Sequence, residues 1–331
     1  MKIQSARLFD RRGFLQIAAA GGGAAAVLGS SAPSSRGETA EKPSSPDAPA
    51  VTRSPQPTTS RYWMNTEGTV RDRFWIFCCA ANTDFRSLQR RSVMTPAEGA
   101  YYLDVPNIIM VQASSTEAKY GRFEPPFDQY ALALRPLKRV AWSVVGSGGF
   151  TAPNETNEVL RLAKGTPNMS AIMLDDFFTG KSEGKRAILT VDELRDVRRQ
   201  IEAIGRKLDI LVTYYYARSL SLPLDDYLEL VDVVTLWGGA ADLPNLDATL
   251  EKVEIRVPNK RIMLGCYMFD FGKKEPISVD LMKLQCEKGL RWLRQGRIEG
   301  MIFLANTVAD FDFPSVEWTR QWIRRIGDEK L

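Results

Sequence analysis

The chain has 331 residues, of which 44% are hydrophobic and 25% charged, with a net charge of +4 and no histidine. This composition is ordinary for a globular protein. The lack of histidine excludes Ser-His-Asp and Cys-His nucleophile activation and the zinc and iron sites that depend on imidazole, so any chemistry must use carboxylates, phenols, amides or a hard cation.

The first 30 residues carry a pattern of their own. The segment DRRGFLQ at residues 10–16 precedes the run IAAAGGGAAAVLG at residues 17–29, whose GGG triplet is unsuited to a helix of the folded protein. Paired arginines, Phe-Leu and a weakly apolar, glycine-rich stretch resemble a twin-arginine (Tat) signal peptide, with Asp10 and Gln16 as departures from the usual pattern. The resemblance implies that residues 1–32 are a signal for the Tat export machinery and that the protein works in a bacterial periplasm or outside the cell.

A second segment separates this signal from the folded domain. Residues 33–60 consist mainly of Ser, Pro, Ala and Thr, which bury too little apolar surface to offset chain ordering, so we expect a disordered linker. The folded domain should then span residues 61–331. No window beyond the signal has the roughly 18 uninterrupted apolar residues of a spanning helix, and we expect no stable membrane insertion after signal removal.

Charge and cysteine usage narrow the possible partners. Removing residues 1–32 deletes four basic residues and one acidic residue, which lowers the net charge from +4 to +1. With no basic tail or patch, we expect no nucleic-acid partner.

The four cysteines lack zinc-type spacing, and buried core thiols are favoured over a disulfide. Because Cys78 and Cys79 are adjacent in a predicted strand, they should point to opposite faces.

From residue 73 onward, eight apolar runs alternate with longer amphipathic segments. Several runs lack polar alternation, as is typical of strands buried on both faces. The predicted strands are 74–82, 107–113, 140–146, 171–177, 209–216, 231–238, 261–270 and 300–306. The helical patterns include 190–208, which begins with a Thr190–Glu193 capping box, and 222–231, 246–257, 278–296 and 315–327. Eight such cycles predict an α/β protein with a single (β/α)8 TIM barrel, and an open doubly wound sheet is the alternative.

Polar and aromatic side chains gather where these strands end, which is the functional face of such a barrel. Flat rings stack on the C–H faces of sugars, while amides and hydroxyls bond sugar OH groups, so this ring predicts a carbohydrate substrate. The candidate substrate-binding residues are Asn82, Gln112, Tyr214, Tyr215, Tyr216, Trp237, Asp242, Tyr267 and Asn306.

The stretch AIMLDDFF at residues 171–178 ends an apolar strand on two adjacent carboxylates, Asp175 and Asp176. A pair at the rim of an apolar barrel can hold split pKa values, which supplies an acid and a base without histidine, as cleavage of a glycosidic bond requires. Adjacent residues rarely present both carboxyls to one substrate, so we expect one of them to act with Asp270 or Asp242 from another strand. The structural alternative is that the pair caps a loop or anchors an arginine.

Residues 73–327 resemble the (β/α)8 glycoside hydrolases. The points of resemblance are LDDFF on the fourth strand, TYYY on the fifth, TLWGG on the sixth and CYMFD on the seventh. There is no DxxDxDxE motif on the fourth strand, nor an Asn-Glu pair there with a second Glu on the seventh. The resemblance implies an exported hydrolase of a poly- or oligosaccharide that uses carboxylate acid/base chemistry, with Asp175, Asp176 and Asp270 as the candidate catalytic residues.

Two other functions fit the same residues. One is a non-catalytic glycan-binding barrel, in which the carboxylates only hydrogen-bond hydroxyl groups. The other is a metal-dependent sugar isomerase or epimerase with oxygen ligands, which the lack of histidine disfavours. The GSGG stretch at residues 146–149 lacks the full GxGxxG pattern of a dinucleotide loop. We therefore expect neither a cofactor nor a metal.

Overall fold

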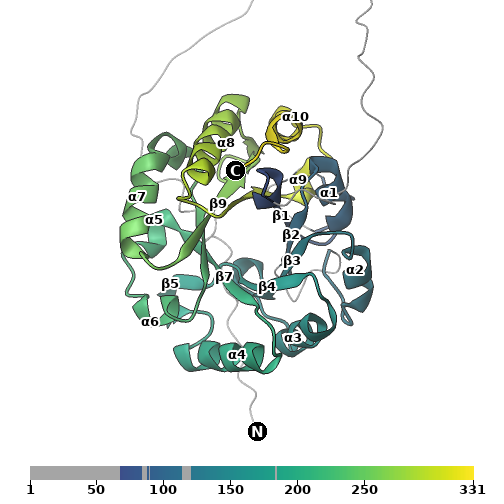
Figure 1. Ribbon diagram of the computed structural model, residues 1–331, viewed down its shortest axis with the longest axis vertical. Helices are drawn as coiled ribbons and strands as arrows, with labels where there is room; N and C mark the ends of the chain where they lie inside the picture. Colours follow the sequence, from purple (N-terminus) through teal and green to yellow (C-terminus); the bar gives the residue numbers. More distant parts are fainter. Residues whose placement is uncertain (1–67, 84–87, 89, 114–120, 183–184) are drawn as a thin grey trace, which may run out of the picture.

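The computed structural model describes residues 68–331 apart from 84–87, 89, 114–120 and 183–184, so the predicted signal peptide and linker lie outside the described residues. Eight parallel strands close into a barrel that the helices surround (Figure 1). Around the ring the strands follow the order β1-β12-β9-β8-β7-β4-β3-β2. Their bounds are β1 Phe74–Cys78, β2 Asn107–Met110, β3 Arg139–Val145, β4 Met169–Leu174, β7 Asp209–Tyr215, β8 Val233–Trp237, β9 Arg261–Tyr267 and β12 Gly300–Leu304. All eight predicted strands are present, and the predicted single (β/α)8 barrel is confirmed.

The remaining elements connect and cover the barrel. The α-helices are α1 Pro96–Leu103, α2 Asp128–Ala133, α3 Glu155–Gly165, α4 Val191–Ala203, α5 Tyr216–Ser219, α6 Asp225–Leu228, α7 Leu246–Arg256, α8 Val279–Arg294, α9 Asn306–Ala309 and α10 Pro314–Ile326. Short 3₁₀ helices are η2 Arg71–Arg73, η3 Ser147–Gly149 and η4 Ala240–Asn245, and two small hairpins pair β5 Phe178–Ser182 with β6 Lys185–Ala187 and β10 Phe269–Asp270 with β11 Glu275–Pro276. Among the described residues, none of these helices combines the length and apolarity needed to cross a bilayer.

Two helical predictions illustrate how local chemistry sets the ends of an element. The capping box at α4 is confirmed, because the Glu193 carboxylate accepts the Thr190 N–H at 2.7 Å and the Thr190 hydroxyl accepts the Glu193 N–H. The predicted helix over 222–231 forms only the single turn of α6. Its last N–H groups, on Leu230 and Val231, bond to carbonyls three residues back, which tightens the turn and ends the α-helix.

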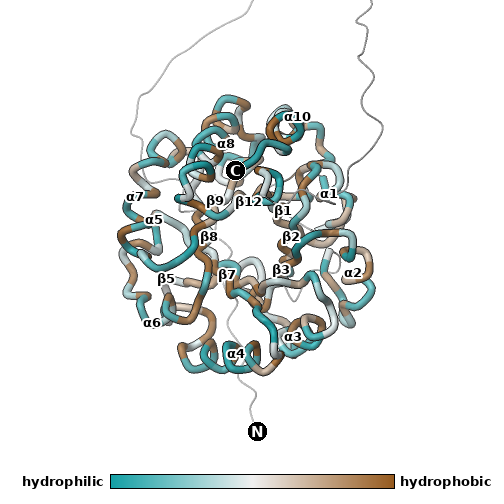
Figure 2. Tube along the Cα trace, viewed as in Figure 1, coloured by the Kyte–Doolittle hydropathy of each residue, from teal (hydrophilic) through white to brown (hydrophobic). Residues whose placement is uncertain are grey.

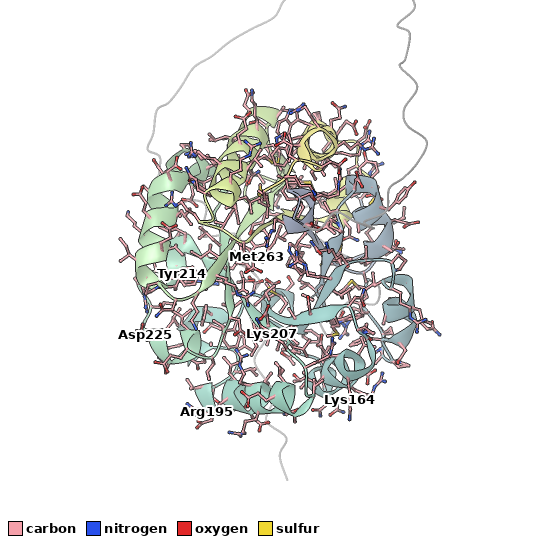
Figure 3. All side chains as sticks on the ribbon, viewed as in Figure 1. Lys164, Arg195, Lys207, Tyr214, Asp225 and Met263 are labelled. Carbon is pink, nitrogen blue, oxygen red and sulfur yellow. The ribbon has the colours of Figure 1, made fainter. Side chains whose placement is uncertain are left out.

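The hydrophobic core has two layers, one inside the ring of strands and one between the strands and the helices. Met263 lies within the ring and Tyr214 outside it, as Figure 3 shows, and the two belong to the inner and outer layers respectively. The strands are largely hydrophobic, whereas the helices carry hydrophilic residues outward (Figure 2). Cys79 faces the inner layer and Cys78 the outer one, as predicted, and all four cysteines are free and buried.

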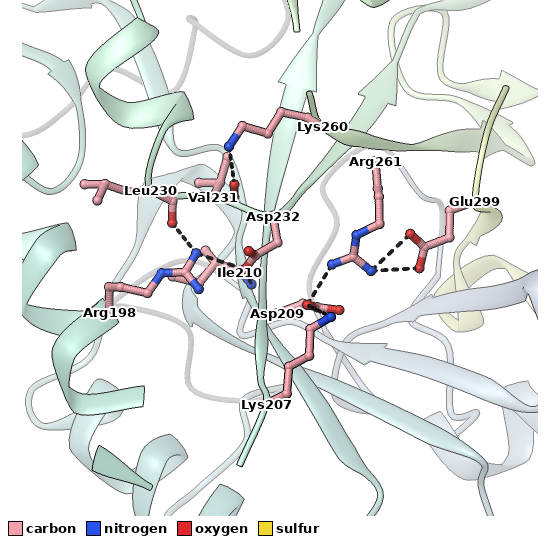
Figure 4. A network of polar contacts seen from close by, with 10 residues as sticks. All are labelled: Arg198, Lys207, Asp209, Ile210, Leu230, Val231, Asp232, Lys260, Arg261 and Glu299. Carbon is pink, nitrogen blue, oxygen red and sulfur yellow. Dashed lines mark hydrogen bonds and ion pairs between the residues drawn. The ribbon is translucent and has the colours of Figure 1, made fainter. Parts of the chain in front are cut away.

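A polar network joins the amino ends of β7, β8, β9 and β12 on one face of the barrel (Figure 4). Arg261 contacts Asp209 at 2.7 Å and Glu299 at 3.1 Å, which links β9 to the start of β7 and to the residue before β12. Arg198 of α4 contacts Asp232 at 2.9 Å, and the same carboxylate accepts the Ile210 N–H at 2.8 Å. This face therefore supports the barrel, and the opposite, carboxyl-terminal face is where a TIM-barrel site is expected.

Candidate active site

Asp175 is the first residue after β4 and points into the barrel. Ala171 and Met173 belong to the inner layer, and strand alternation places Asp175 on the same side. Its N–H donates to the Val145 carbonyl at 2.8 Å, which continues the pairing with β3 by one residue. Its side chain is buried, with 5% exposure, and accepts a 2.7 Å hydrogen bond from the Thr213 hydroxyl of β7.

Asp176 leaves the strand geometry, with φ at +45° in the left-handed region. This turn lets a second carboxylate stay near the first instead of pointing to the helices, where regular alternation would send it. Its Oδ1 accepts the Tyr215 hydroxyl at 2.6 Å, and its Oδ2 accepts the Gly148 N–H at 2.7 Å. Gly148 has φ of +70°, a conformation that favours glycine, and it aims its N–H at the carboxylate.

Burial and charge set the protonation of this cluster. Burial raises the pKa of Asp175 well above its ordinary value, the neighbouring Asp176 charge raises it further, and the Thr213 hydrogen bond offsets part of the rise. Burial, together with the charges of both carboxylates, also raises the pKa of the Tyr215 and Tyr267 hydroxyls. Since both phenols respond to both carboxylates, the four side chains form one electrostatic unit at the end of β4, β7 and β9.

Aromatic rings extend this unit into the barrel. The Trp237 ring lies 5.1 Å from the Tyr267 ring and 6.1 Å from the Phe77 ring, measured between centroids. A Cβ at Gly265 would lie 2.2 Å from Trp237, so only glycine leaves room for this indole. Trp237 is buried and its Nε1 donates to Thr235 at 2.9 Å.

The two candidate amides hold backbone segments in place. The Gln112 side chain accepts the Phe123 N–H at 2.9 Å and donates to the Phe123 carbonyl at 3.0 Å. The Asn306 side chain accepts the Cys79 N–H and donates to the Cys79 and Met94 carbonyls, all within 3.0 Å. Both side chains are buried, so the hydrogen-bonding capacity that we expected to reach sugar hydroxyls is used within the protein.

The two aspartates predicted as partners of Asp175 and Asp176 bond to their own loops. Asp242 accepts the Gly239 N–H at 2.9 Å at the start of η4. Asp270 accepts the Gly272 and Lys273 N–H groups at 2.9 and 3.1 Å in the turn between β10 and β11. Among the described residues, no hydrogen bond joins either of them to the pair.

Three other candidates lie apart from the pair. Tyr214 points outward into the layer under the helices, and burial raises its pKa to about 12. Tyr216 begins α5 and its hydroxyl is within 3.4 Å of the Lys252 ammonium. Asn82 is exposed in a turn with φ of +64°. The structure therefore brings together Asp175, Asp176, Tyr215, Tyr267 and Trp237.

Thr213, Gly148 and Cys79 also belong to this cluster, although the strand ends alone do not predict them. Thr213 lies two residues before Tyr215 in the same strand, so the two side chains share a face. Strand alternation could therefore have identified Thr213 from the sequence. Burial and the Asp175 charge raise the pKa of the Cys79 thiol. Within residues 68–331, the gaps excepted, no three acidic or cysteine side chains converge as a metal site would require.

Solved structures of low sequence identity are similar to this barrel. A putative alpha-L-fucosidase from Bacteroides thetaiotaomicron is similar at 11% identity and a TM-score of 0.50, over 82% of this chain and 97% of that one. A family 18 chitinase from Crocus vernus has 10% identity and a TM-score of 0.46, over 76% of this chain and 98% of its own. The tryptophan synthase alpha-subunit from Pyrococcus furiosus has 11% identity and a TM-score of 0.45, over 78% and 98%. The chain matches no protein-family model and no curated protein. Glycoside hydrolases are thus among the structures it resembles, but likeness at this identity shows the barrel fold alone.

Proposed function

We propose that the protein is an exported glycoside hydrolase that cleaves a poly- or oligosaccharide with the Asp175–Asp176 pair. The observation that carries the proposal is the contrast between two adjacent carboxylates at the end of β4. Asp175 is buried and its pKa is raised, whereas both oxygens of Asp176 accept hydrogen bonds from Tyr215 and Gly148. An acid that keeps its proton beside a carboxylate that acts as an acceptor is the division of labour that glycosidic cleavage uses.

The proposed reaction assigns each group one task. Asp175 donates its proton to the glycosidic oxygen as the bond to the anomeric carbon breaks. Asp176 faces the positive charge that develops on the sugar ring and accepts a proton from the attacking water, whose hydroxyl joins the anomeric carbon. Tyr215 positions Asp176, and the partly exposed Tyr267 ring, which packs against the buried Trp237, provides an apolar surface for the sugar.

The proposed location follows from the N-terminal pattern. The Arg11-Arg12 pair and the Gly-rich run after it support export by the Tat machinery to the periplasm or the cell exterior. We propose no cofactor for the reaction, because water and two carboxylates balance it.

The test is a screen of the purified protein against polysaccharides and aryl glycosides, followed by kinetics of Asp175→Asn and Asp176→Asn. We expect kcat on any substrate found to fall by about 10²–10⁴-fold in the Asp175→Asn variant, because the amide cannot donate the proton. Asp192→Asn is the matched control, since that aspartate lies on α4 with 91% of its side chain exposed. Full hydrolysis by both site variants would refute the proposal, and glycan binding without hydrolysis by the parent protein would favour a non-catalytic carbohydrate-binding barrel.

A further inference from the structure

A second polar site lies in a cavity of about 280 Å³ between the segment before α2 and the loop that leads into α3. Its wall includes the aromatic rings of Phe123 and Phe127 and two prolines, Pro125 and Pro153. Glu124, Pro153 and other residues of its lining are exposed, so the cavity reaches the surface. Its size suits one small ring rather than a long chain.

Two charged side chains in this cavity have atoms without hydrogen-bond partners in the described part of the chain. Glu155 is 3% exposed, and its Oε2 accepts the Ala152 N–H at 2.8 Å while its Oε1 has no partner. The buried Nε of Arg122 also has none. Buried polar atoms are rarely left unpaired, so these two atoms mark a place where a polar ligand could bond.

The loop after β3 connects this cavity with the candidate active site. Gly148 in this loop donates its N–H to Asp176, and Phe150, two residues later, lies under the Arg122 guanidinium at 5.0 Å from ring centroid to Cζ. The same loop thus contacts both the candidate active site and a residue that lines the cavity.

We propose that this cavity binds the carboxylate of an acidic sugar unit through Arg122 and Glu155, with the sugar ring against Phe123 and Phe127. Arg122 supplies the positive charge and N–H donors that a carboxylate requires. The extension to catalysis, in which the proposed hydrolase acts on an acidic glycan, rests on the proposed function. Binding of the acidic sugar in the cavity does not depend on that function.

The charges that face Glu155 decide how the site depends on pH. Burial raises the pKa of Glu155 to about 7, although Arg122 and the Ala152 N–H lower it. Glu124 lies at the mouth, and Glu158 on the same helix is already paired with Arg161, whose own second partner is Asp128. Below pH 7 Glu155 is neutral and can donate its O–H to a ligand carboxylate. Above pH 7 it is charged and repels that ligand.

The test is titration calorimetry of the full-length protein with D-glucuronate, D-glucose and acetate at pH 5.5 and 8.5. We expect D-glucuronate to bind about 30-fold more weakly at pH 8.5, because only about 3% of Glu155 then keeps its proton. Acetate and D-glucose should each bind more weakly than D-glucuronate at pH 5.5, since one lacks the ring and the other the charge.

Variants separate the two charged groups. Glu155→Gln retains an acceptor for Ala152 and mimics the neutral acid, so its affinity for D-glucuronate should be independent of pH. Arg122→Gln should lose at least about tenfold at both pH values. Arg90→Gln is the matched control, because Arg90 also stacks on a ring, that of Phe311 at 4.8 Å, and does not line the cavity. Thermal unfolding checks that each variant folds.

Several results would overturn the proposal. Equal affinity for D-glucose and D-glucuronate would show that the site does not select a carboxylate. Equal affinity for acetate and D-glucuronate would show that the sugar ring contributes nothing to binding. Tighter D-glucuronate binding at pH 8.5 would contradict the role of Glu155. Because none of these measurements uses hydrolysis, their failure is distinguishable from failure of the proposed activity, which the Asp175→Asn kinetics test separately.

Discussion

At the scale of single residues, the pKa of Asp175 is set by opposing effects, and a substitution can remove one of them. Burial and the Asp176 charge raise its pKa, and the hydrogen bond from Thr213 lowers it. Removing that hydrogen bond should therefore raise the pKa further without removing the carboxyl group.

We predict that Thr213→Val moves the alkaline limb of the kcat/KM profile to higher pH. The sign follows because a proton donor acts only below its pKa, and a higher pKa extends that range upward. Thr319→Val is the control, since this buried threonine on α10 bonds the Ser315 carbonyl of its own helix. A limb that stays in place in Thr213→Val would mean that another group supplies the proton.

At the scale of elements, Arg198 links α4 to the segment before β8, on the face opposite the candidate site. Arg198 donates to the Leu230 carbonyl and to Asp232, both of which precede β8. Without Arg198, a half-buried carboxylate and a carbonyl lose a donor, and such a loss is usually worth about 1–3 kcal/mol.

We predict that Arg198→Met lowers the free energy of unfolding by about 1–2 kcal/mol in urea titrations and leaves hydrolytic activity unchanged. Arg199→Met is the matched control on the same helix, because Arg199 is 63% exposed and its ion pair is with Asp196, three residues earlier. That control should change stability by less than about 0.5 kcal/mol. Equal losses in the two variants would argue that helix propensity, and not the contact with β8, is responsible.

At the scale of the whole molecule, the buried acids make folding stability depend on pH. The pKa of Glu155 is about 7 in the folded protein, against 4.5 for an exposed glutamate. The folded state therefore binds this proton more tightly, and the stability it contributes is present at low pH and lost as pH rises from about 4.5 to 7. The raised pKa of Asp175 acts in the same direction.

We predict that the free energy of unfolding falls between pH 5 and pH 8, and that the fall is about 2–3 kcal/mol smaller in Glu155→Gln. Urea titrations of the two proteins at both pH values provide the measurement. Identical slopes would show that Glu155 is ionised in the folded state throughout this range.

The sequence predicts the barrel far better than the site. Runs such as those in β3 and β8 are apolar without alternation because both of their faces are buried, and eight of them in turn allow few other folds. Alternation also predicts that only one of Tyr214, Tyr215 and Tyr216 faces the mouth with Asp175. What it does not predict is the backbone turn at Asp176, which keeps two neighbouring carboxylates on one side.

The roles of the remaining candidate residues depend on how individual loops fold. Asp242 and Asp270 satisfy N–H groups of their own turns, and a strand-end pattern cannot separate such a residue from a catalytic one. Arg122 and Glu155 are 33 positions apart in the sequence, on either side of β3, and their meeting depends on how two loops fold. A contact between two distant loops leaves no periodic pattern in the sequence, so sequence periodicity does not predict it.

The two ends of the described chain meet on the barrel's amino-terminal face. The Leu331 N–H bonds the Gly68 carbonyl at 3.0 Å, and Thr69 pairs with Lys330 just before η2 leads into β1. An anchor or support attached ahead of Gly68 would hold the molecule by its base, with Asp175 and Asp176 at the far end. Immobilised in this orientation on a bead, the protein would keep the candidate active site on the side that faces away from the support.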